Sequence, residues 1–135
     1  MSAVDAAKIW SLNYRVLLSV IACAETDICA LGLESKELFL LVEIDEHPYP
    51  AELAATLSMP KATVTVYLKR LEAAGFVRRE IDAADLRRHR LLLTPAGRRV
   101  ATGGLALLSG EFDKRLGRLS AAQQKELKHL LEKIL

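Results

Sequence analysis

The sequence predicts a mainly α-helical protein with one small β-hairpin. Apolar residues recur at steps of three and four over long stretches at both ends of the chain. Proline and glycine divide the middle into short segments, and two β-type runs, 76–81 and 89–93, flank a charged connection. With 135 residues the chain has the length of one domain, which is enough for a core without disulfides or structural metal.

The first predicted helix covers residues 5–31. Its main apolar line includes Ile9 and Val16 at helical spacing. A second line through Trp10 and Tyr14 makes the apolar stripe wider than packing against one neighbour requires. We therefore expect this helix to bury one side in its own subunit and another against a partner chain.

Gly32 predicts the end of that helix, because glycine readily adopts the left-handed conformation of a helix cap. A second helix is expected to follow as far as about residue 46, with Leu33 packed on Leu38 at its start. The loop 47–50, His-Pro-Tyr-Pro, ends it.

Two short helices are predicted next, with a tight connection between them. The first spans 50–57 and has Pro50 at its first position, where a missing N–H does no harm. The turn 58–60 follows, and the second helix runs over 61–74 to Gly75. Two short helices joined by a turn of this length form a helix-turn-helix.

The second of these helices has one apolar and one polar side. At about 100° per residue, Val64, Leu68, Leu71 and Gly75 lie together and are predicted to face the core. The opposite side carries residue types that contact phosphates or base edges in a major groove. The residues that we expect to contact DNA here are Lys61, Ala62, Thr63, Thr65, Val66, Lys69 and Arg70.

The rest of the chain is predicted as a hairpin followed by two helices. The strand runs 76–81 and 89–93 are joined by a charged loop, so the hairpin has a basic tip. Thr94 and Pro95 begin a helix to about residue 118, in which the pair Gly103-Gly104 marks a bend or a close contact. Ser120 and Gln123 form a capping box for a last helix with the apolar stripe Leu127, Leu130, Leu131 and Ile134.

The charges are sorted along the chain. Residues 1–58 carry 3 basic and 9 acidic side chains, whereas residues 59–99 carry 10 basic and 4 acidic ones. A basic segment inside a nearly neutral protein is the pattern of a surface that binds a polyanion such as DNA. The alternative is a solvated charged face without a partner.

Two motif blocks carry a family resemblance. The first comprises Leu53-Ala54, Thr63-Val64-Thr65, Arg70-Leu71-Glu72 and Gly75-Phe76-Val77-Arg78-Arg79; the second comprises Asp82-x-x-Asp85-x-Arg87 and Leu93-Thr94-x-x-Gly97. With these blocks in register, the chain resembles the MarR family of winged helix-turn-helix transcriptional regulators. Pro60 and Val66 depart from the pattern, which often has a capping Ser and a basic residue there.

The resemblance implies one domain over residues 1–135, with dimerisation helices in 1–33 and 95–135 and a winged helix-turn-helix lobe for DNA binding in 34–94. It implies a homodimer on a pseudopalindromic operator in double-stranded DNA, with recognition helices about 34 Å apart. The expected function is sequence-specific transcriptional regulation in the cytoplasm, most simply repression. A winged-helix module that binds protein instead of DNA is the alternative.

The hairpin, or wing, supplies the strongest single candidate. Arg87 is expected to enter a minor groove, where narrow A·T tracts deepen the negative potential, with Asp85 holding its side chain extended. The alternative for this pair is a surface salt bridge of at most about 1 kcal/mol. Arg88 and Arg90 are expected to contact phosphates, and Arg70 on the second short helix is the expected reader of base edges.

Relatives are often released from DNA by a small aromatic or anionic effector, so the resemblance also implies a ligand. The residues proposed to border it are Trp10, Tyr14, His47 and Tyr49. The alternative is that these aromatic residues belong to the core or to apolar packing.

Cysteine and metal chemistry give weaker alternatives. Cys23 and Cys29 are six residues apart, about 9 Å along a helix, which exceeds the roughly 7 Å limit for a disulfide. A bridge between subunits or one oxidisable thiol stays open against two buried, inert cysteines. A metal site of His47 with Glu43 or Glu46 is conceivable, but no metal-spaced cluster, glycine-rich phosphate loop or nucleophile motif is visible.

These patterns predict no enzyme, no cofactor and no bound metal. They also predict no membrane span, because the uncharged run from Val16 to Ala24 is about half of the ~20 residues that a spanning helix needs.

Overall fold

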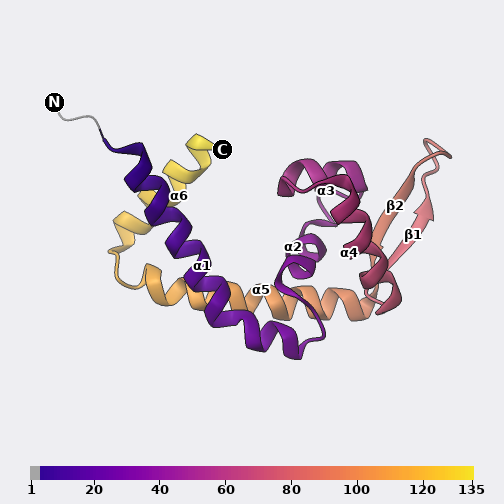
Figure 1. The fold of residues 1–135 in the computed structure, drawn as a ribbon, viewed down its shortest axis with the longest axis horizontal. Coiled ribbons are helices and arrows are strands. Elements are labelled where there is room, and N and C mark those ends of the chain that lie inside the picture. The colour runs from indigo at the N-terminus through magenta and orange to yellow at the C-terminus, as the bar shows by residue number, and fades with distance from the viewer. Residues whose placement is uncertain (1–3) are drawn as a thin grey trace. The chain divides into compact units, whose positions relative to one another are not determined.

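The computed structural model describes residues 4–135 (Figure 1). In chain order its elements are α1 (Ala6–Ala30), α2 (Ser35–Glu43), α3 (Pro50–Leu57), α4 (Lys61–Ala73), β1 (Val77–Ile81), β2 (His89–Leu93), α5 (Pro95–Leu116) and α6 (Ala121–Ile134). The predicted fold class, mainly α with one hairpin, is confirmed. The chain divides into two compact units, one with the residues up to Ala24 and 107–135, the other with 25–106, and α1 and α5 contribute to both.

The second helix is shorter than the sequence predicted. It ends at Glu43 instead of about residue 46. The amide of Ile44 donates to Leu41 O at 3.4 Å, three residues back, which tightens the last turn. Residues 44–46 continue as a turn that the His47 amide closes by donating to Glu43 O at 2.9 Å, and Pro48 disfavours a helical conformation for His47 itself.

The unit of residues 25–106 holds the main core. Side chains from all of its helices and from the hairpin meet there, including Ile28, Leu38, Leu41, Leu53 and Leu91, each under 2% exposed. From α4 the core receives Val64, Leu68 and Leu71, as predicted. The prediction that Gly75 faces the core is wrong. It is exposed, because α4 ends at Ala73 and Gly75 turns the chain away with φ +80°.

Thr94 joins the end of the hairpin to the start of α5. Its hydroxyl accepts a hydrogen bond from the Gly97 amide at 3.0 Å and donates to Gly75 O at 2.6 Å. The Thr94 amide also donates to Phe76 O at 3.0 Å. A Cβ on Gly97 would lie 1.9 Å from that same Phe76 oxygen. The Thr94-x-x-Gly97 motif thus lets α5 start directly against the backbone that leads into β1.

Of the pair Gly103-Gly104, which was predicted as a bend or a close contact, one residue makes the close contact. A Cβ on Gly104 would lie 2.4 Å from the buried Leu38 Cδ1, whereas a Cβ on Gly103 would meet only Leu31 Cδ1, at 4.0 Å. Gly104 is therefore the residue that lets α5 approach α2.

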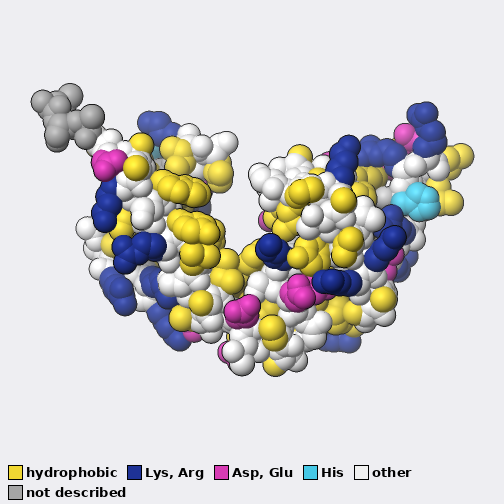
Figure 2. Space-filling view, in the orientation of Figure 1, with side chains coloured by type: hydrophobic (Ala, Val, Ile, Leu, Met, Phe, Trp, Pro, Cys, Tyr) yellow, Lys and Arg dark blue, Asp and Glu magenta, His cyan; other side chains and the backbone are white. Residues whose placement is uncertain are grey.

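The other unit buries little of its own apolar surface. Of its residues, Val20 and Ala24 are buried, while large apolar side chains of α1 and α6 are exposed, and Figure 2 shows apolar groups gathered on this unit. The exposed ones include Ile9, Trp10, Leu12, Tyr14, Val16, Leu17, Leu130, Leu131 and Ile134. The predicted Ser120–Gln123 capping box opens α6.

Within residues 4–135, no helix taken alone combines the length and hydrophobicity needed to cross a membrane. α1 and α2 reach that threshold only as a pair, and the pair is bent by 86°.

Candidate nucleic-acid interface

The outer side of α4 is exposed as the sequence predicted. Lys61, Ala62, Thr65, Val66 and Lys69 are exposed, and Thr63 is half-buried. The Thr65 hydroxyl donates to Lys61 O at 3.0 Å. Pro60 stands at the N-cap without a side-chain hydrogen bond, so the helix start lacks a capping hydroxyl. The side of α4 offered to solvent thus combines two lysines, hydroxyl groups and the small apolar surface of Ala62 and Val66.

Arg70 lies near the other end of this face and has two neighbours. Its Nη1 is 3.6 Å from Glu34 Oε1, and its guanidinium carbon is 5.5 Å from the centre of the Tyr67 ring. The Arg70 and Glu34 side chains are each more than half exposed. An exposed pair of this kind is worth at most about 1 kcal/mol, so Arg70 can exchange it for a DNA contact.

β1 and β2 form an antiparallel hairpin, and Figure 1 shows it extending beyond α4. Its register pairs Val77 with Leu93 and Ile81 with His89. The loop between the strands is closed by two backbone bonds of 2.9 Å, from the Asp82 amide to Arg88 O and from the Arg88 amide to Asp85 O. The tip is therefore an ordered loop that can fix the directions of its side chains.

Arg87 lies at this tip and is directed into solvent. Its side chain is 92% exposed. Asp85 Oδ1 accepts hydrogen bonds from the Arg87 amide at 3.0 Å and from Arg87 Nε at 3.3 Å. The predicted contact between Asp85 and Arg87 is present, and it leaves the outer guanidinium nitrogens facing outward.

Arg88 points the other way, back toward α3. Its guanidinium carbon lies 3.5 Å from the centre of the Tyr49 ring, and its Nη2 is 3.8 Å from Glu52 Oε1. Arg90, two residues further along, is exposed on β2 opposite Glu80. Arg88 stays 47% exposed beside these partners, so phosphate contact by Arg88, like that by Arg90, stays a prediction.

Tyr49 has a contact that the sequence did not indicate. Its hydroxyl donates a hydrogen bond to Asp82 Oδ2, at the start of the hairpin loop. This bond raises the pKa of the Tyr49 hydroxyl and lowers the pKa of the Asp82 carboxyl. The two residues are 33 positions apart, and no local pattern could have paired them.

The four residues predicted to border an effector lie in two units. Trp10 and Tyr14 stack in one of them, with ring centres 5.6 Å apart, and both are exposed. In the other, His47 Nε2 is 3.9 Å from Glu43 Oε2, and Tyr49 contacts the wing. A pocket formed by all four stays a prediction.

The conceivable metal ligands do come together. Potential ligand atoms of Glu43, Glu46 and His47 lie within 4.8 Å of one another at the end of α2. Glu46 is exposed and the other two are half-buried, and solvated clusters of this kind are common without a metal. Metal binding there stays an untested alternative to the prediction of no bound metal.

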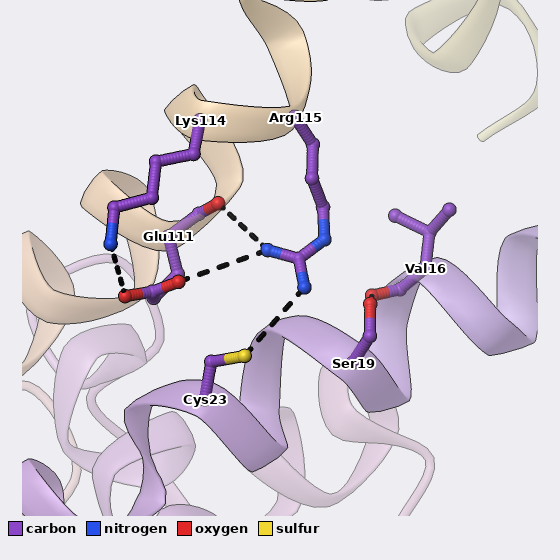
Figure 3. Close-up of polar contacts among 6 residues, drawn as sticks. All are labelled: Val16, Ser19, Cys23, Glu111, Lys114 and Arg115. Carbon is purple, nitrogen blue, oxygen red and sulfur yellow. Dashed lines mark hydrogen bonds and ion pairs between the residues drawn. The ribbon is translucent and has the colours of Figure 1, made fainter.

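Both cysteines are free and exposed, so the expectation of two buried, inert cysteines is wrong for the single chain. They flank the buried side of α1, which carries Ala24 and Ile28. Figure 3 shows Cys23 beside Arg115, whose Nη2 donates to the sulfur at 3.7 Å. Arg115 is itself held by Glu111 O at 2.9 Å. Oxidation of a thiol, or a bridge between subunits, stays a prediction.

Lys114 also contacts Glu111, the residue that holds Arg115. It donates to Glu111 Oε1 at 2.8 Å, and that bond raises the pKa of Lys114 (Figure 3).

The family model described as "MarR family" matches residues 31–88. The HTH-type transcriptional repressor Rv2887 of Mycobacterium tuberculosis is 32% identical to this chain over 99% of the chain and 98% of its own length. The chain belongs to the MarR family. MarR family regulators are DNA-binding transcription factors, and the resemblance predicted from the two motif blocks is confirmed.

Solved MarR family structures agree with the fold. Rv2887 in complex with DNA has a TM-score of 0.73 and 32% identity, with 92% of this chain and 94% of that chain covered. Rv2887 in complex with salicylic acid has the same TM-score and identity, covering 92% and 93%. The regulator SlyA, at 21% identity and TM-score 0.82 over 93% and 90%, supports the fold alone.

Proposed function

We propose that this MarR family protein is a repressor that binds an operator in double-stranded DNA as a homodimer and is released by a small aromatic acid. One observation carries the DNA-binding part. The outer face of α4 and the 92% exposed Arg87 at the wing tip belong to one compact unit. The sequence similarity extends along the whole length of Rv2887, a repressor that was solved with DNA. We further propose that the protein regulates transcription without catalysing a reaction. We also propose that it acts in the cytoplasm, where its operator lies.

In this mechanism α4 and the wing contact different grooves of the DNA. α4 enters a major groove and positions Lys61, Lys69 and Arg70 on phosphates and base edges, while Ala62 and Val66 contact thymine methyl groups. The wing places Arg87 in the adjacent minor groove, where Asp85 keeps it extended. Few side chains on α4 can make two hydrogen bonds to one base, so we infer that much of the specificity comes from DNA shape at the wings.

The exposed apolar face of α1 and α6 supplies the dimer interface in this proposal. Between α1, α5 and α6 lies a groove of about 520 Å³, lined by apolar residues that include Leu12, Val16, Phe112, Leu116 and Leu127 and by polar ones that include Arg15 and Arg115. Monomeric soluble proteins rarely leave large contiguous apolar patches uncovered. A second copy of the chain would bury this face, which agrees with dimerisation helices in 1–33 and 95–135 and a DNA-binding lobe in 34–94.

The DNA-binding proposal is tested with Arg87→Ala and, as a control, Lys36→Ala. Both changes remove one positive charge, and Lys36 is an exposed residue of α2 to which the proposal assigns no DNA contact. Binding sites are first selected from a random duplex pool, and affinity is then measured with A·T-rich and G·C-rich flanks. Arg87→Ala should lower affinity and remove the flank preference, whereas Lys36→Ala should keep both. Equal flank preference in wild type and Arg87→Ala would refute the assigned role of Arg87.

A gel shift on random duplex at low salt tests the broader assignment. A DNA-binding regulator binds such DNA nonspecifically through its basic surface. A module for protein interaction would leave the duplex unshifted, and that result would overturn the proposed function.

The effector part rests on the relative's solved complexes with salicylic acid and with p-aminosalicylic acid. Trp10 is the single tryptophan of the chain and stacks on Tyr14. Titration with salicylate should therefore change the intrinsic fluorescence of Trp10 if the ligand binds nearby, and it should release a bound operator in a gel shift. Benzyl alcohol, which keeps the ring without the charge, serves as the control. An operator complex that is unaffected by saturating salicylate would contradict this part of the proposal.

A further inference from the structure

We propose that Tyr49 is a positioning residue that sets the direction of the wing and thereby the way in which Arg87 meets DNA. The inference rests on the proposed DNA binding and adds a residue outside α4 and the wing that controls specificity. Tyr49 lies in the loop before α3 and contacts the hairpin through its hydroxyl and its ring. The residue before it, Pro48, contacts the hairpin through its carbonyl oxygen.

The hairpin buries few of its own residues, so it has little to hold it in place by itself. β1 buries one of its five residues, Val77, and β2 buries one, Leu91. An isolated two-stranded hairpin is only marginally stable in water. The direction of the tip therefore depends on contacts that join the hairpin to the rest of the unit.

The loop before α3 makes such contacts at two levels. At the middle of β2, Pro48 O accepts a hydrogen bond from the Leu91 amide at 2.8 Å. At the start of the hairpin loop, the Tyr49 hydroxyl donates to Asp82 Oδ2. Because these bonds come from adjacent residues and reach different heights of the hairpin, they restrain its tilt toward α3.

A chain of bonds then leads from Tyr49 to the tip. Asp82 Oδ1 accepts from the Ala84 amide at 2.8 Å, and the Asp82 amide donates to Arg88 O at 2.9 Å. The Arg88 amide in turn donates to Asp85 O at 2.9 Å, and Asp85 Oδ1 accepts from Arg87. The Tyr49 bond thus fixes the carboxylate around which the loop that carries Arg87 is folded.

The ring of Tyr49 contacts Arg88, whereas the adjacent Arg87 extends into solvent. Arg88 places its guanidinium over the ring and near Glu52 on α3, and so holds the back of the loop. Arg87, the preceding residue of the same loop, extends into solvent with its side chain 92% exposed. Wing direction and the exposure of Arg87 are therefore linked through Tyr49.

Two substitutions of Tyr49 separate the hydroxyl from the ring. Tyr49→Phe removes the bond to Asp82 and keeps the surface on which Arg88 rests, while Tyr49→Leu removes both. Asp82→Asn weakens the same bond from the other side, and Asp113→Asn on α5 is the matched carboxylate control, since Asp113 lies in the other unit. Thermal unfolding is recorded for each variant to show that it folds.

The decisive readout is the ratio of affinities for A·T-rich and G·C-rich flanks around one core site. A lost hydrogen bond of ordinary net strength corresponds to a change of about threefold to tenfold. Tyr49→Phe and Asp82→Asn should each lower the ratio by about that factor, and the double variant should lower it no further than the larger single effect. Discrimination at the core positions contacted by α4, and all values for Asp113→Asn, should stay unchanged. A wild-type flank ratio in Tyr49→Phe would overturn the proposal.

Hydrogen exchange of the wing amides makes the test independent of DNA. In Tyr49→Phe the amides of Asp82, Ala84 and Arg88 should exchange faster, while those of β1 near Val77 stay protected. If the wild type binds no DNA, the proposed function fails, but faster exchange would still support the link between Tyr49 and the wing. Unchanged exchange would refute that link whatever the binding data show.

Discussion

Gly97→Ala tests the junction on which both the wing and α5 depend. The Cβ of an alanine at this position would lie 1.9 Å from Phe76 O and 2.8 Å from Phe76 C. Ordinary contact begins at 3.4 Å, so the start of α5 and the Phe76 carbonyl would have to separate by about 1.5 Å. The obstacle is backbone, which cannot rotate away as a flexible side chain does.

The expected loss follows from three contributions. Overpacking of this kind typically costs about 1–3 kcal/mol. Moving the carbonyl also lengthens the hydrogen bond from the Thr94 amide, now 3.0 Å, which is worth about 1 kcal/mol. Alanine recovers at most about 1 kcal/mol of helix propensity over glycine. We therefore expect Gly97→Ala to lower the free energy of unfolding by about 1–3 kcal/mol, or roughly 3–10 °C in Tm.

The same helix provides the control. Gly103→Ala gains the same helix propensity, but its Cβ would meet only Leu31 Cδ1 at 4.0 Å. It should be as stable as wild type or more stable by up to about 1 kcal/mol. Urea unfolding followed by circular dichroism, at equal protomer concentration because the proposed dimer makes stability depend on concentration, measures both. If Gly97→Ala matches Gly103→Ala, the steric account of the Thr94-x-x-Gly97 motif is wrong.

Three further predictions concern the interface, the wing and DNA. Leu130→Asp places a charge on the exposed apolar face of α6 and should convert dimers to monomers in sedimentation velocity; an unchanged dimer would exclude this face. The pKa of the Asp82 carboxyl is lowered by the Tyr49 hydrogen bond, so its contribution is present above the unfolded pKa and lost as pH falls through the folded value. The extra wing protection of wild type over Tyr49→Phe in hydrogen exchange should hold from about pH 7 to pH 5 and shrink below about pH 4, whereas a difference that persists in acid would point to another cause. Operator affinity should fall roughly 10³-fold to 10⁵-fold between about 50 and 200 mM salt if six to ten phosphates are contacted, and a flat response would contradict phosphate binding.

Much of the fold could be predicted because its signals are local. Apolar spacing indicated the helices, Gly32 and Gly75 end α1 and α4 with positive φ, and the capping residues Thr94 and Ser120 begin α5 and α6. The core side of α4 followed from helical geometry alone, except at Gly75, which lies beyond the last helical turn. Each of these features depends on residues within a few positions of one another.

The binding surface was only partly predictable for the same reason. The exposed face of α4 and the Asp85–Arg87 contact are local, so sequence reasoning found them. The difference between Arg87 and Arg88 is not local, because it depends on a tyrosine about forty residues earlier in the chain. The exposure of Cys23 likewise depends on which side of α1 meets the core, and its contact with Arg115 joins residues 92 positions apart.

The sequence by itself therefore determined the family, the order of the elements and the residues able to contact DNA, since spacing and residue type express all three. Only the tertiary structure decided which arginine is presented to solvent and which is held by Tyr49. It also decided which of two neighbouring glycines in α5 must lack a side chain. Those outcomes depend on close approach between segments far apart in the chain, and packing sets such distances while sequence spacing does not record them.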